Sequence, residues 1–268
     1  MYIRMLEHRD FNRYDFSSLR TGIMAGSPCP IKVMQDVIDK MNMKEITITY
    51  GQTEASPACT MTTVDETLEH RVATVGKELP FMETKIVDAD TGEDVPNGTP
   101  GEFVVRGYNV MKGYYKMPEA TAATIDKDGW LHTGDIAVKD DDGYYKITGR
   151  LKDMIIRGGE NIFPKEIEDF IYTHPDVVDV QIVAVPSEKY GEEAYAFVTK
   201  REGSTVTEKD IQNYVANNMA RHKVPSYVEF ISKMPMTASG KIQKFVLRDM
   251  AKKTLGIENN TFVFKDTK

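Results

Sequence analysis

Hydrophobic positions along the chain recur first at helical spacing and then in short runs. Residues 30–41 place apolar side chains three and four positions apart, which predicts a helix that begins at Pro30. Residues 45–49 read EITIT and predict a short strand. Further on, β-like runs alternate with turn sequences that contain Asn-Gly, Pro-Gly and Asp-Gly; the runs are residues 83–87, 102–106 and 144–147. This second pattern predicts a small β-barrel or folded sheet.

The pattern changes after Gly149-Arg150, where longer helical and strand-like segments interleave. Helices are predicted at 164–173, 207–219 and 244–253, and strands at 177–185, 195–199 and 227–231. The helix at 207 opens with Thr207 three residues before Asp210, which is typical of a capping box. These segments predict a small α+β domain over 150–268, preceded by an α/β and β-rich part over 1–149, with the boundary at 149–152.

Composition narrows the class of protein. The 268 residues are enough for roughly two domains. A formal net charge of −7 argues against a nucleic-acid binder, which usually presents a basic face. Cys29 and Cys59 are the two cysteines, too few for a disulfide framework, so free thiols are expected. No run approaches the roughly 18 apolar residues of a membrane span, and no signal peptide is evident, so a cytoplasmic protein is expected.

The segment Tyr50-Gly-Gln-Thr-Glu54 follows the strand at 45–49 and combines three functions in five residues. The ring of Tyr50 could lie over a nucleotide base, although a core tyrosine is the simpler reading for this residue alone. Thr53 offers a hydroxyl to a phosphate, and Glu54 offers a hard oxygen to Mg²⁺. The segment therefore predicts part of a nucleotide site.

Asp135 lies in the sequence His132-Thr-Gly-Asp135, which reads as a turn, and Arg150 follows it. A carboxylate can accept hydrogen bonds from both ribose hydroxyls, and a guanidinium can donate to the same sugar. Either residue alone is more simply a turn aspartate or a surface arginine. A bend at Asp140–Gly143 would bring both to the same end of a sheet, which favours the ribose-binding reading.

Two further turns contribute candidate residues. In Ala25-Gly26-Ser27-Pro28, Gly26 would let the backbone approach a flat ligand, although a plain turn before the helix explains this tetrapeptide more simply. Lys241 follows Ser239-Gly240, a turn that could carry one positive charge into a phosphate or carboxylate site.

The order of these motifs is more specific than any one of them. Taken together, Tyr50–Glu54, Thr133–Asp135, Gly149–Asp153 and Pro235–Lys241 resemble the adenylate-forming superfamily of acyl-CoA synthetases, luciferases and peptide-synthetase adenylation domains. The resemblance runs from about residue 19 to 248 and is strongest to the medium-chain fatty acyl-CoA synthetases. Lys244 departs from it, standing where many members have arginine.

The resemblance implies a fold and a reaction. Residues 1–149 would be the carboxyl-terminal part of the large domain, a βα piece with a small barrel, and 150–268 the small mobile domain. ATP would activate a carboxylic acid, a medium- or long-chain fatty acid, as an acyl-adenylate with release of pyrophosphate. CoA would then accept the acyl group.

The resemblance also implies roles for individual residues. Lys241, Thr53 and Glu54 would act in catalysis, with Glu54 holding Mg²⁺. Lys152 would be the hinge about which the small domain turns between the two steps. The nucleotide would be bound by Gly26, Ser27, Pro28, Tyr50, Gly51, Gln52, Thr53, Asp135, Arg150 and Lys241, and CoA by Arg157, Gly158, Gly159 and Glu160.

One family element has no counterpart here. The glycine-rich loop that wraps the β- and γ-phosphates precedes the tyrosine motif in the family, yet nothing in residues 1–49 matches it. A truncated reading frame or a second polypeptide that supplies the rest would explain this. The chain alone is then expected to be inactive. Sheet edges and apolar surface would be exposed on residues 1–149, and the chain could associate with another polypeptide through them.

Two other functions stay open at this point. A non-catalytic remnant could bind a nucleotide, CoA or a partner protein. An adenylation domain could instead load a separate carrier protein, although no carrier sequence follows the motifs.

Overall fold

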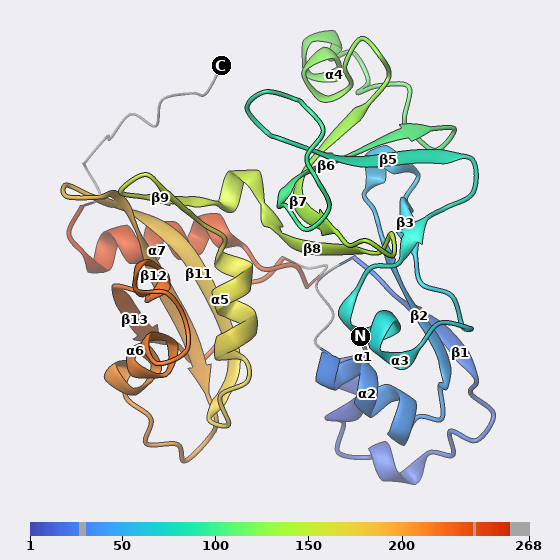
Figure 1. Cartoon of the computed structure of the whole chain (residues 1–268). Helices are drawn as coiled ribbons and strands as arrows, with labels where there is room; N and C mark the ends of the chain where they lie inside the picture. Colours follow the sequence, from blue (N-terminus) through green and yellow to red (C-terminus); the bar gives the residue numbers. More distant parts are fainter. Residues whose placement is uncertain (27–30, 238–239, 258–268) are drawn as a thin grey trace. The chain divides into compact units, whose positions relative to one another are not determined.

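The chain forms two compact units, residues 1–148 and 149–268, in a computed structural model (Figure 1). The structure describes residues 1–26, 31–237 and 240–257. Among these residues, each unit has two hydrophobic clusters of its own. The units are therefore described one at a time.

The first unit opens with a small four-stranded sheet in the order β1-β2-β3-β4. Strands β1 (Thr21–Met24) and β2 (Glu45–Tyr50) are parallel and are joined through helix α2 (Ile31–Lys40), the kind of crossover connection that parallel strands need. The short strands β3 (Thr60–Met61) and β4 (Lys77–Glu78) add to it antiparallel, and α3 (Leu68–Ala73) lies between them in sequence. The amino-terminal helix α1 (Tyr2–Leu6) precedes the turn η1 (Phe11–Arg13).

The core of this part confirms the helical pattern seen in the sequence. Met34, Val37 and Met41 are buried, one turn apart, against Ile46 of β2. Burying an aliphatic side chain of this size stabilises a fold by about 1.5–3 kcal/mol, so these four side chains fix α2 on the sheet. Pro30, the predicted first residue of the helix, lies outside the described residues.

The expected barrel is an open antiparallel sheet instead. Its strands run in the order β5 (Met82–Val87), β6 (Gly101–Gly107), β7 (Leu131–Lys139) and β8 (Tyr145–Arg150), with β5 and β8 at the edges among the described residues. Helix α4 (Pro118–Thr124) lies between β6 and β7 in sequence. At the β8 edge, Tyr145 exchanges backbone hydrogen bonds with Val75 (2.8 Å) and Gly76 (3.0 Å), so β8 meets the segment before β4 and not β5.

The second unit is the α+β domain expected from the sequence. Strand β12 (Gly191–Lys200) pairs with β11 (Val177–Ser187), β9 (Ile155–Arg157) and β13 (Tyr227–Phe230), and β10 (Glu160–Ile162) pairs with β9. The helices are α5 (Pro164–Ile171), α6 (Glu208–Ala216) and α7 (Lys244–Thr254), with short turns η3 (Leu151–Asp153) and η4 (Arg221–Lys223). The predicted capping box at Thr207 and Asp210 is present at the start of α6.

Alternation along the strands explains the layers of this unit. Ile182 of β11 points into the cluster that includes Ile167 of α5 and Ile211 of α6, whereas the next residue, Val183, joins Leu247 of α7. Successive strand side chains face opposite sides of a sheet. Helices α5 and α6 therefore cover one face of the sheet, and α7 covers the other.

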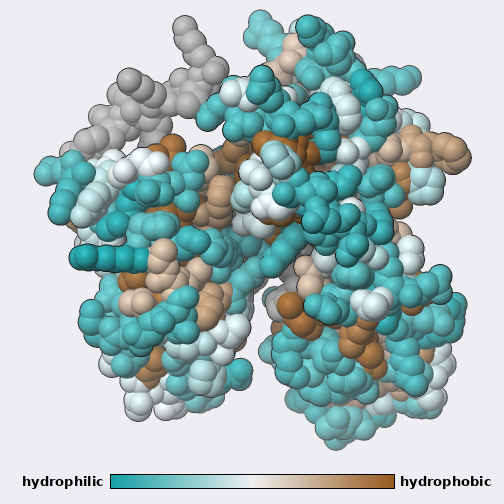
Figure 2. All heavy atoms as spheres, viewed as in Figure 1, coloured by the Kyte–Doolittle hydropathy of each residue, from teal (hydrophilic) through white to brown (hydrophobic). Residues whose placement is uncertain are grey.

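The face of the molecule shown in Figure 2 is predominantly polar, with apolar side chains that stand singly or in small groups. In the first unit, Phe81 is 94% exposed, and Ile23 on the outer strand β1 is 52% exposed. Whether this surface mediates association stays a prediction. Among residues 1–26, 31–237 and 240–257, no helix is long and apolar enough to cross a membrane.

Candidate functional site

Tyr50 ends strand β2, and its hydroxyl donates a hydrogen bond to Oδ2 of Asp135 at 2.8 Å. Its ring packs edge-on against Phe103 of β6, with 5.2 Å between the centroids. These contacts link the two sheets of the first unit. They also place together two candidate residues that lie 85 positions apart in the sequence.

Gly51 is required by the close packing behind Tyr50. A Cβ atom at this position would lie 1.9 Å from the carbonyl oxygen of Pro57, a contact that no side chain can make. The absence of a side chain lets the chain leave β2 and turn immediately into η2 (Thr53–Ala55). Gln52 precedes this turn in an extended conformation.

Asp135 lies in strand β7, which corrects the sequence-based expectation of a turn carboxylate. The residue is 4% exposed. Burial, followed by the Asp135 charge, raises the pKa of the Tyr50 hydroxyl well above its ordinary value. The same two causes raise the pKa of the buried Cys59 thiol to about 12, so this free cysteine remains a neutral thiol near pH 7. Burial and, after it, the Asp135 charge thus both favour the neutral forms of Tyr50 and Cys59.

Glu54 is the carboxylate that the sequence offered to Mg²⁺. Its Oε1 accepts a hydrogen bond from the Tyr114 hydroxyl at 2.8 Å, and its carbonyl oxygen accepts one from Met111 N, also at 2.8 Å. The bond to Glu54 raises the pKa of Tyr114. Thr53 beside it is exposed. In the described part of the chain, no cluster of three or more His, Cys, Asp or Glu side chains could hold a metal ion.

The remaining candidates of the first unit are Gly26, Ser27 and Pro28. Gly26 is exposed and has φ +81°, the left-handed conformation that glycine adopts readily. Ser27 and Pro28 lie outside the described residues.

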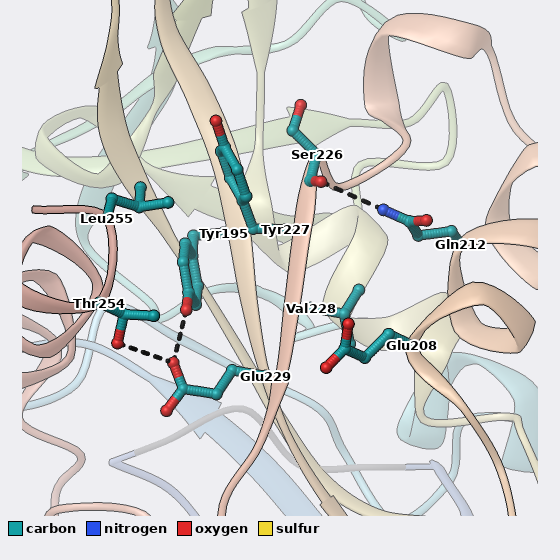
Figure 3. A pocket seen from close by; sticks show the side chains of 9 residues that line it. All are labelled: Tyr195, Glu208, Gln212, Ser226, Tyr227, Val228, Glu229, Thr254 and Leu255. Atoms are coloured by element: carbon teal, nitrogen blue, oxygen red, sulfur yellow. Dashed lines mark hydrogen bonds between the residues drawn. The ribbon is translucent and has the colours of Figure 1, made fainter.

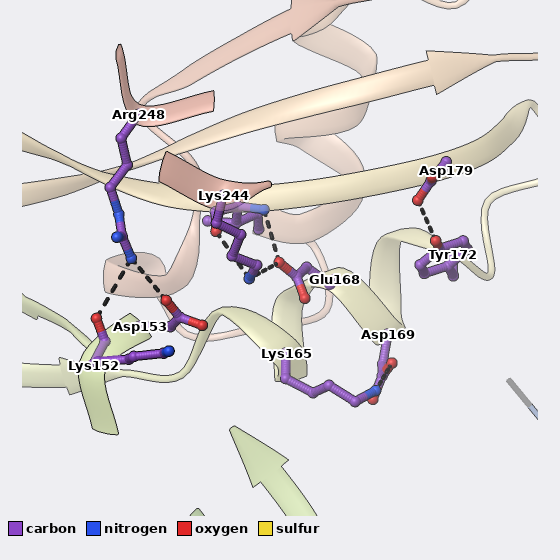
Figure 4. Close-up of polar contacts among 10 residues, drawn as sticks. Lys152, Asp153, Lys165, Glu168, Asp169, Tyr172, Asp179, Lys244 and Arg248 are labelled. Carbon is purple, nitrogen blue, oxygen red and sulfur yellow. Dashed lines mark hydrogen bonds and ion pairs between the residues drawn. The ribbon is translucent and has the colours of Figure 1, made fainter. Parts of the chain in front are cut away.

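The predicted hinge lies at the start of the second unit, where a side chain of α7 contacts it. Arg150 ends β8 and is exposed, and Lys152, also exposed, belongs to η3. Nη2 of Arg248 donates to Oδ1 of Asp153 at 2.7 Å and lies 3.5 Å from the Lys152 carbonyl oxygen (Figure 4). One turn earlier on α7, Lys244 donates to the buried Glu168 at 2.9 Å (Figure 4).

The predicted CoA residues form a tight hairpin between β9 and β10. Gly158 and Gly159 have φ +61° and +89° and make its two-residue turn. The Arg157 guanidinium stacks on Tyr190, 4.3 Å from the ring centroid, and pairs with Glu193 at 3.3 Å. Glu160 is exposed. Arg157 therefore already has an aromatic and an acidic partner.

Lys241 lies just before α7, next to Ile242, which forms an antiparallel bridge with Met236. Its backbone N–H donates to Oγ1 of Thr237 at 3.1 Å, and its carbonyl oxygen accepts from Thr237 N at 2.8 Å. The side chain is exposed, and Gly240 before it has φ +83°. Ser239, the other residue of the predicted turn, lies outside the described residues.

A cavity in the second unit lies among none of these residues (Figure 3). It is lined by β12, β13, α6 and the end of α7. Tyr195 and Tyr227 stack there with 5.5 Å between their centroids, and Glu229 accepts hydrogen bonds from Tyr195 and Thr254. Sequence reasoning gave no signal for this cavity.

The structure thus brings Tyr50 and Asp135 into contact, and Gly51 and Glu54 follow Tyr50 closely along the chain. Sequence reasoning missed Phe103 and Tyr114, which hold the side chains of Tyr50 and Glu54. Both lie in the 101–115 segment, GEFVVRGYNVMKGYY, whose dense aromatic and glycine content was the available signal.

Comparison with known proteins supplies a family. The family model of AMP-binding enzymes matches residues 1–115, and that of the AMP-binding enzyme C-terminal domain matches residues 166–241. YngI of Bacillus subtilis strain 168, which carries the name of an acyl-CoA synthetase, is 57% identical over 93% of this chain. The mitochondrial medium-chain acyl-CoA ligase ACSF2 of Mus musculus is 45% identical over 95% of it.

A solved structure agrees with these relatives. The ATP-bound crystal structure of MatB from Rhodopseudomonas palustris superposes on 94% of this chain with a TM-score of 0.85 and 32% sequence identity. The chain spans 45% of the length of YngI, 42% of ACSF2 and 50% of the MatB chain. With two family models matched in order along it, this chain belongs to the family of AMP-binding enzymes.

Proposed function

We propose that the chain is part of an acyl-CoA synthetase, which joins a carboxylic acid to CoA through an acyl-adenylate at the expense of ATP. The observation that carries this proposal is the contact between Tyr50 and the buried Asp135, which places two nucleotide-binding candidates together in one unit. The names of the relatives YngI and ACSF2 support the choice of CoA as the acyl acceptor.

The proposed substrate is a medium- or long-chain fatty acid. Support comes from the name of ACSF2, a medium-chain acyl-CoA ligase with 45% identity to this chain. Because the chain spans less than half of that relative, residues beyond it would also shape the acyl pocket. A cytoplasmic location, expected from the sequence, stays a prediction.

Asp135 is proposed to accept hydrogen bonds from the two ribose hydroxyls of the nucleotide. A buried carboxylate makes stronger hydrogen bonds than one in water, because the low local dielectric screens its charge less. Tyr50 would hold the carboxylate in orientation through Oδ2, and Arg150 would donate to the same sugar. Gly26, Gly51 and Gln52 would leave backbone groups accessible to the base and phosphate.

Thr53 and Glu54 are proposed to face the phosphates. Mg²⁺ typically takes one or two protein carboxylates and completes its shell with water and phosphate oxygens, so the single carboxylate of Glu54 fits it. Bound there, the ion would neutralise phosphate charge. The Tyr114 hydroxyl on Oε1 would keep the Glu54 side chain in place.

The second unit is proposed to supply groups to both steps. Lys241 would stabilise the negative charge that develops as the carboxylate attacks the α-phosphate, since an exposed lysine is a compact cation on a flexible side chain. Lys152 would be the hinge between the two steps. The hairpin with Arg157, Gly158, Gly159 and Glu160 would contact CoA in the second step.

AMP binding by the 268-residue chain tests the nucleotide site. Asp135→Asn keeps an acceptor for the Tyr50 hydroxyl but removes the charge, so we expect AMP to bind about tenfold more weakly by calorimetry, the low end for one charge-assisted hydrogen bond. Asp142→Asn, on the exposed bend after β7, is the matched control and should leave the affinity unchanged. Equal affinities for wild type and Asp135→Asn would remove Asp135 from the site.

A further inference from the structure

The segment that carries Asp135 is a bulge in the antiparallel pairing of β6 with β7. Glu102 pairs with Ile136, and Val104 pairs with His132, so that residues 133–135 all lie opposite the single residue Phe103. Gly134, in the middle, has φ +69°. Bulges re-aim side chains and are frequent beside active sites. The direction of the Asp135 side chain therefore depends on how this bulge is held.

Glu102 holds the bulge from the opposite strand. Its Oε1 accepts a hydrogen bond from Gly134 N at 2.9 Å, and its Oε2 lies 2.7 Å from Nδ1 of His132. One carboxylate thus contacts both the middle of the bulge, at Gly134, and the residue that precedes it, His132. Glu102 is only 6% exposed, so its charge is costly unless both oxygens are satisfied, and these two contacts satisfy them.

Hydrogen bonds from Thr133 complete the arrangement. Its Oγ1 donates to the Phe103 carbonyl oxygen at 2.6 Å and accepts from Asp135 N at 3.1 Å. The backbone N–H groups of Gly134 and Asp135 are therefore both hydrogen-bonded, the first to Glu102 and the second to Thr133. The side chain of Asp135, the last residue of the bulge, accepts a hydrogen bond from the Tyr50 hydroxyl.

We propose that Glu102 is the positioning residue of the nucleotide site, a buried carboxylate that shapes the 132–135 bulge and thereby aims Asp135 at the ribose. The inference rests on the proposed function, because it takes Asp135 as the ribose-binding group. Glu102 does not touch the nucleotide; it acts through Gly134 and His132. Any hydrogen bond that Asp135 accepts from a ligand therefore depends on Glu102.

The test combines a substitution at Glu102 with one at Asp135. Glu102→Met keeps the approximate volume but removes both acceptors, and we expect AMP affinity to fall about tenfold or more by calorimetry. Glu102→Gln can still accept a hydrogen bond from Gly134 N and should keep most of the wild-type AMP affinity. In an Asp135→Asn background, Glu102→Met should cause no further loss, because the group that it positions is already changed.

The matched control is Glu83→Gln on the neighbouring strand β5. This carboxylate bonds the Arg106 side chain and has no contact with the bulge, so AMP affinity should not change. An equal loss from Glu102→Met in both Asp135 backgrounds would show a general structural role and overturn the proposal. An unchanged affinity in a folded Glu102→Met protein would overturn it as well.

A measurement without ligand separates this inference from the proposed function. The ¹³Cζ NMR signal of Tyr50 reports its hydrogen bond to Asp135, so Glu102→Met should shift this signal and Glu83→Gln should not. If wild type binds no AMP, the proposed nucleotide role fails, while this shift still decides whether Glu102 aims Asp135. If Glu102→Met does not fold, the Gly134 amide of wild type decides: slow hydrogen exchange supports the clamp, and exchange as fast as in an exposed loop overturns it.

Discussion

A carboxylate buried next to a phenol, as Asp135 is next to Tyr50, acts differently from one on the surface. Its charge contributes to raising the pKa values of both Tyr50 and Cys59, so its field reaches several neighbours through a poorly screening interior. A ribose hydroxyl that donates to such a group would gain more than it would in water. Removing the side chain altogether would leave the Tyr50 hydroxyl without this partner, which is why Asp135→Asn is the more informative change.

The raised pKa of His132 predicts that the stability of the first unit depends on pH. Its hydrogen bond to Glu102, and secondarily the charges of Glu102 and Asp126 (3.8 Å from Nε2), raise its pKa above the ordinary 6.5 despite partial burial. A group whose pKa is higher in the folded state contributes stability that is complete below the unfolded value. We therefore expect the free energy of unfolding of the first unit to fall as pH rises from about 6.5 through the raised pKa.

The measurement is a denaturant titration at several pH values together with an NMR titration of the His132 ring. In Glu102→Gln, the His132 pKa should move back toward 6.5, because the first cause of its shift is gone. In His132→Gln, this component of the pH dependence should disappear. A wild-type His132 pKa at or below 6.5 would contradict the interpretation.

At the scale of elements, the longer helices α5, α6 and α7 were predicted well, whereas the short helices α1, α3 and α4 and the strand β7 were missed. Helices α5, α6 and α7 each bury one regular face, so their apolar residues recur at a constant spacing along the sequence. Strand β7 contains the bulge at 133–135, which breaks the two-residue alternation that identifies a strand. The segment therefore read as a turn, although its Asp135 was recognised as a candidate.

The contacts that build the site could not be derived from patterns. Tyr50 meets Asp135 across 85 residues, and Glu102 meets His132 across 30, and both pairs arise from how two sheets and a bulge pack. Local periodicity holds no information on such pairings. The motif order indicated which residues belong together, whereas the partners that orient them became visible only in the fold.

Helix α7 gives a prediction at this scale. Lys244→Met would leave the buried Glu168 with Ile182 N (2.8 Å) as its remaining partner in the described contacts, so we expect the second unit to lose about 3 kcal/mol, the low end for breaking a buried ion pair. Lys165→Met on α5 is the control. Its partner Asp169 is 54% exposed, and such pairs contribute about 0–1 kcal/mol (Figure 4).

Chemical denaturation followed by circular dichroism measures both changes. Adding Glu168→Gln to Lys244→Met should recover part of the lost stability, because the unpaired charge is then removed. Similar losses for Lys244→Met and Lys165→Met would mean that the Glu168 charge is adequately solvated, and would refute the buried-pair interpretation.

At the scale of the whole molecule, each unit has its own hydrophobic clusters and hydrogen-bonded sheets. In the first unit, the clusters centre on α2 with β2 and on the β5–β8 sheet. In the second, they lie on the two faces of the β11–β12 sheet. A unit with a complete core can unfold on its own, so the molecule need not unfold in a single cooperative step.

The single tryptophan makes this independence measurable. Trp130 belongs to the first unit, where the Arg106 guanidinium lies 4.6 Å and the Lys85 ammonium 4.8 Å from its ring, so its fluorescence reports that unit alone. Circular dichroism reports both units. We expect a thermal or denaturant transition in circular dichroism that has no counterpart in fluorescence. AMP at 100 times its Kd should stabilise the Trp130 transition by about 2.7 kcal/mol, because a ligand stabilises the folded unit that binds it. Asp135→Asn, tested at the same AMP concentration, should reduce the shift of the Trp130 transition. Coincident transitions by both probes, shifted together by AMP, would show instead that the two units fold as one.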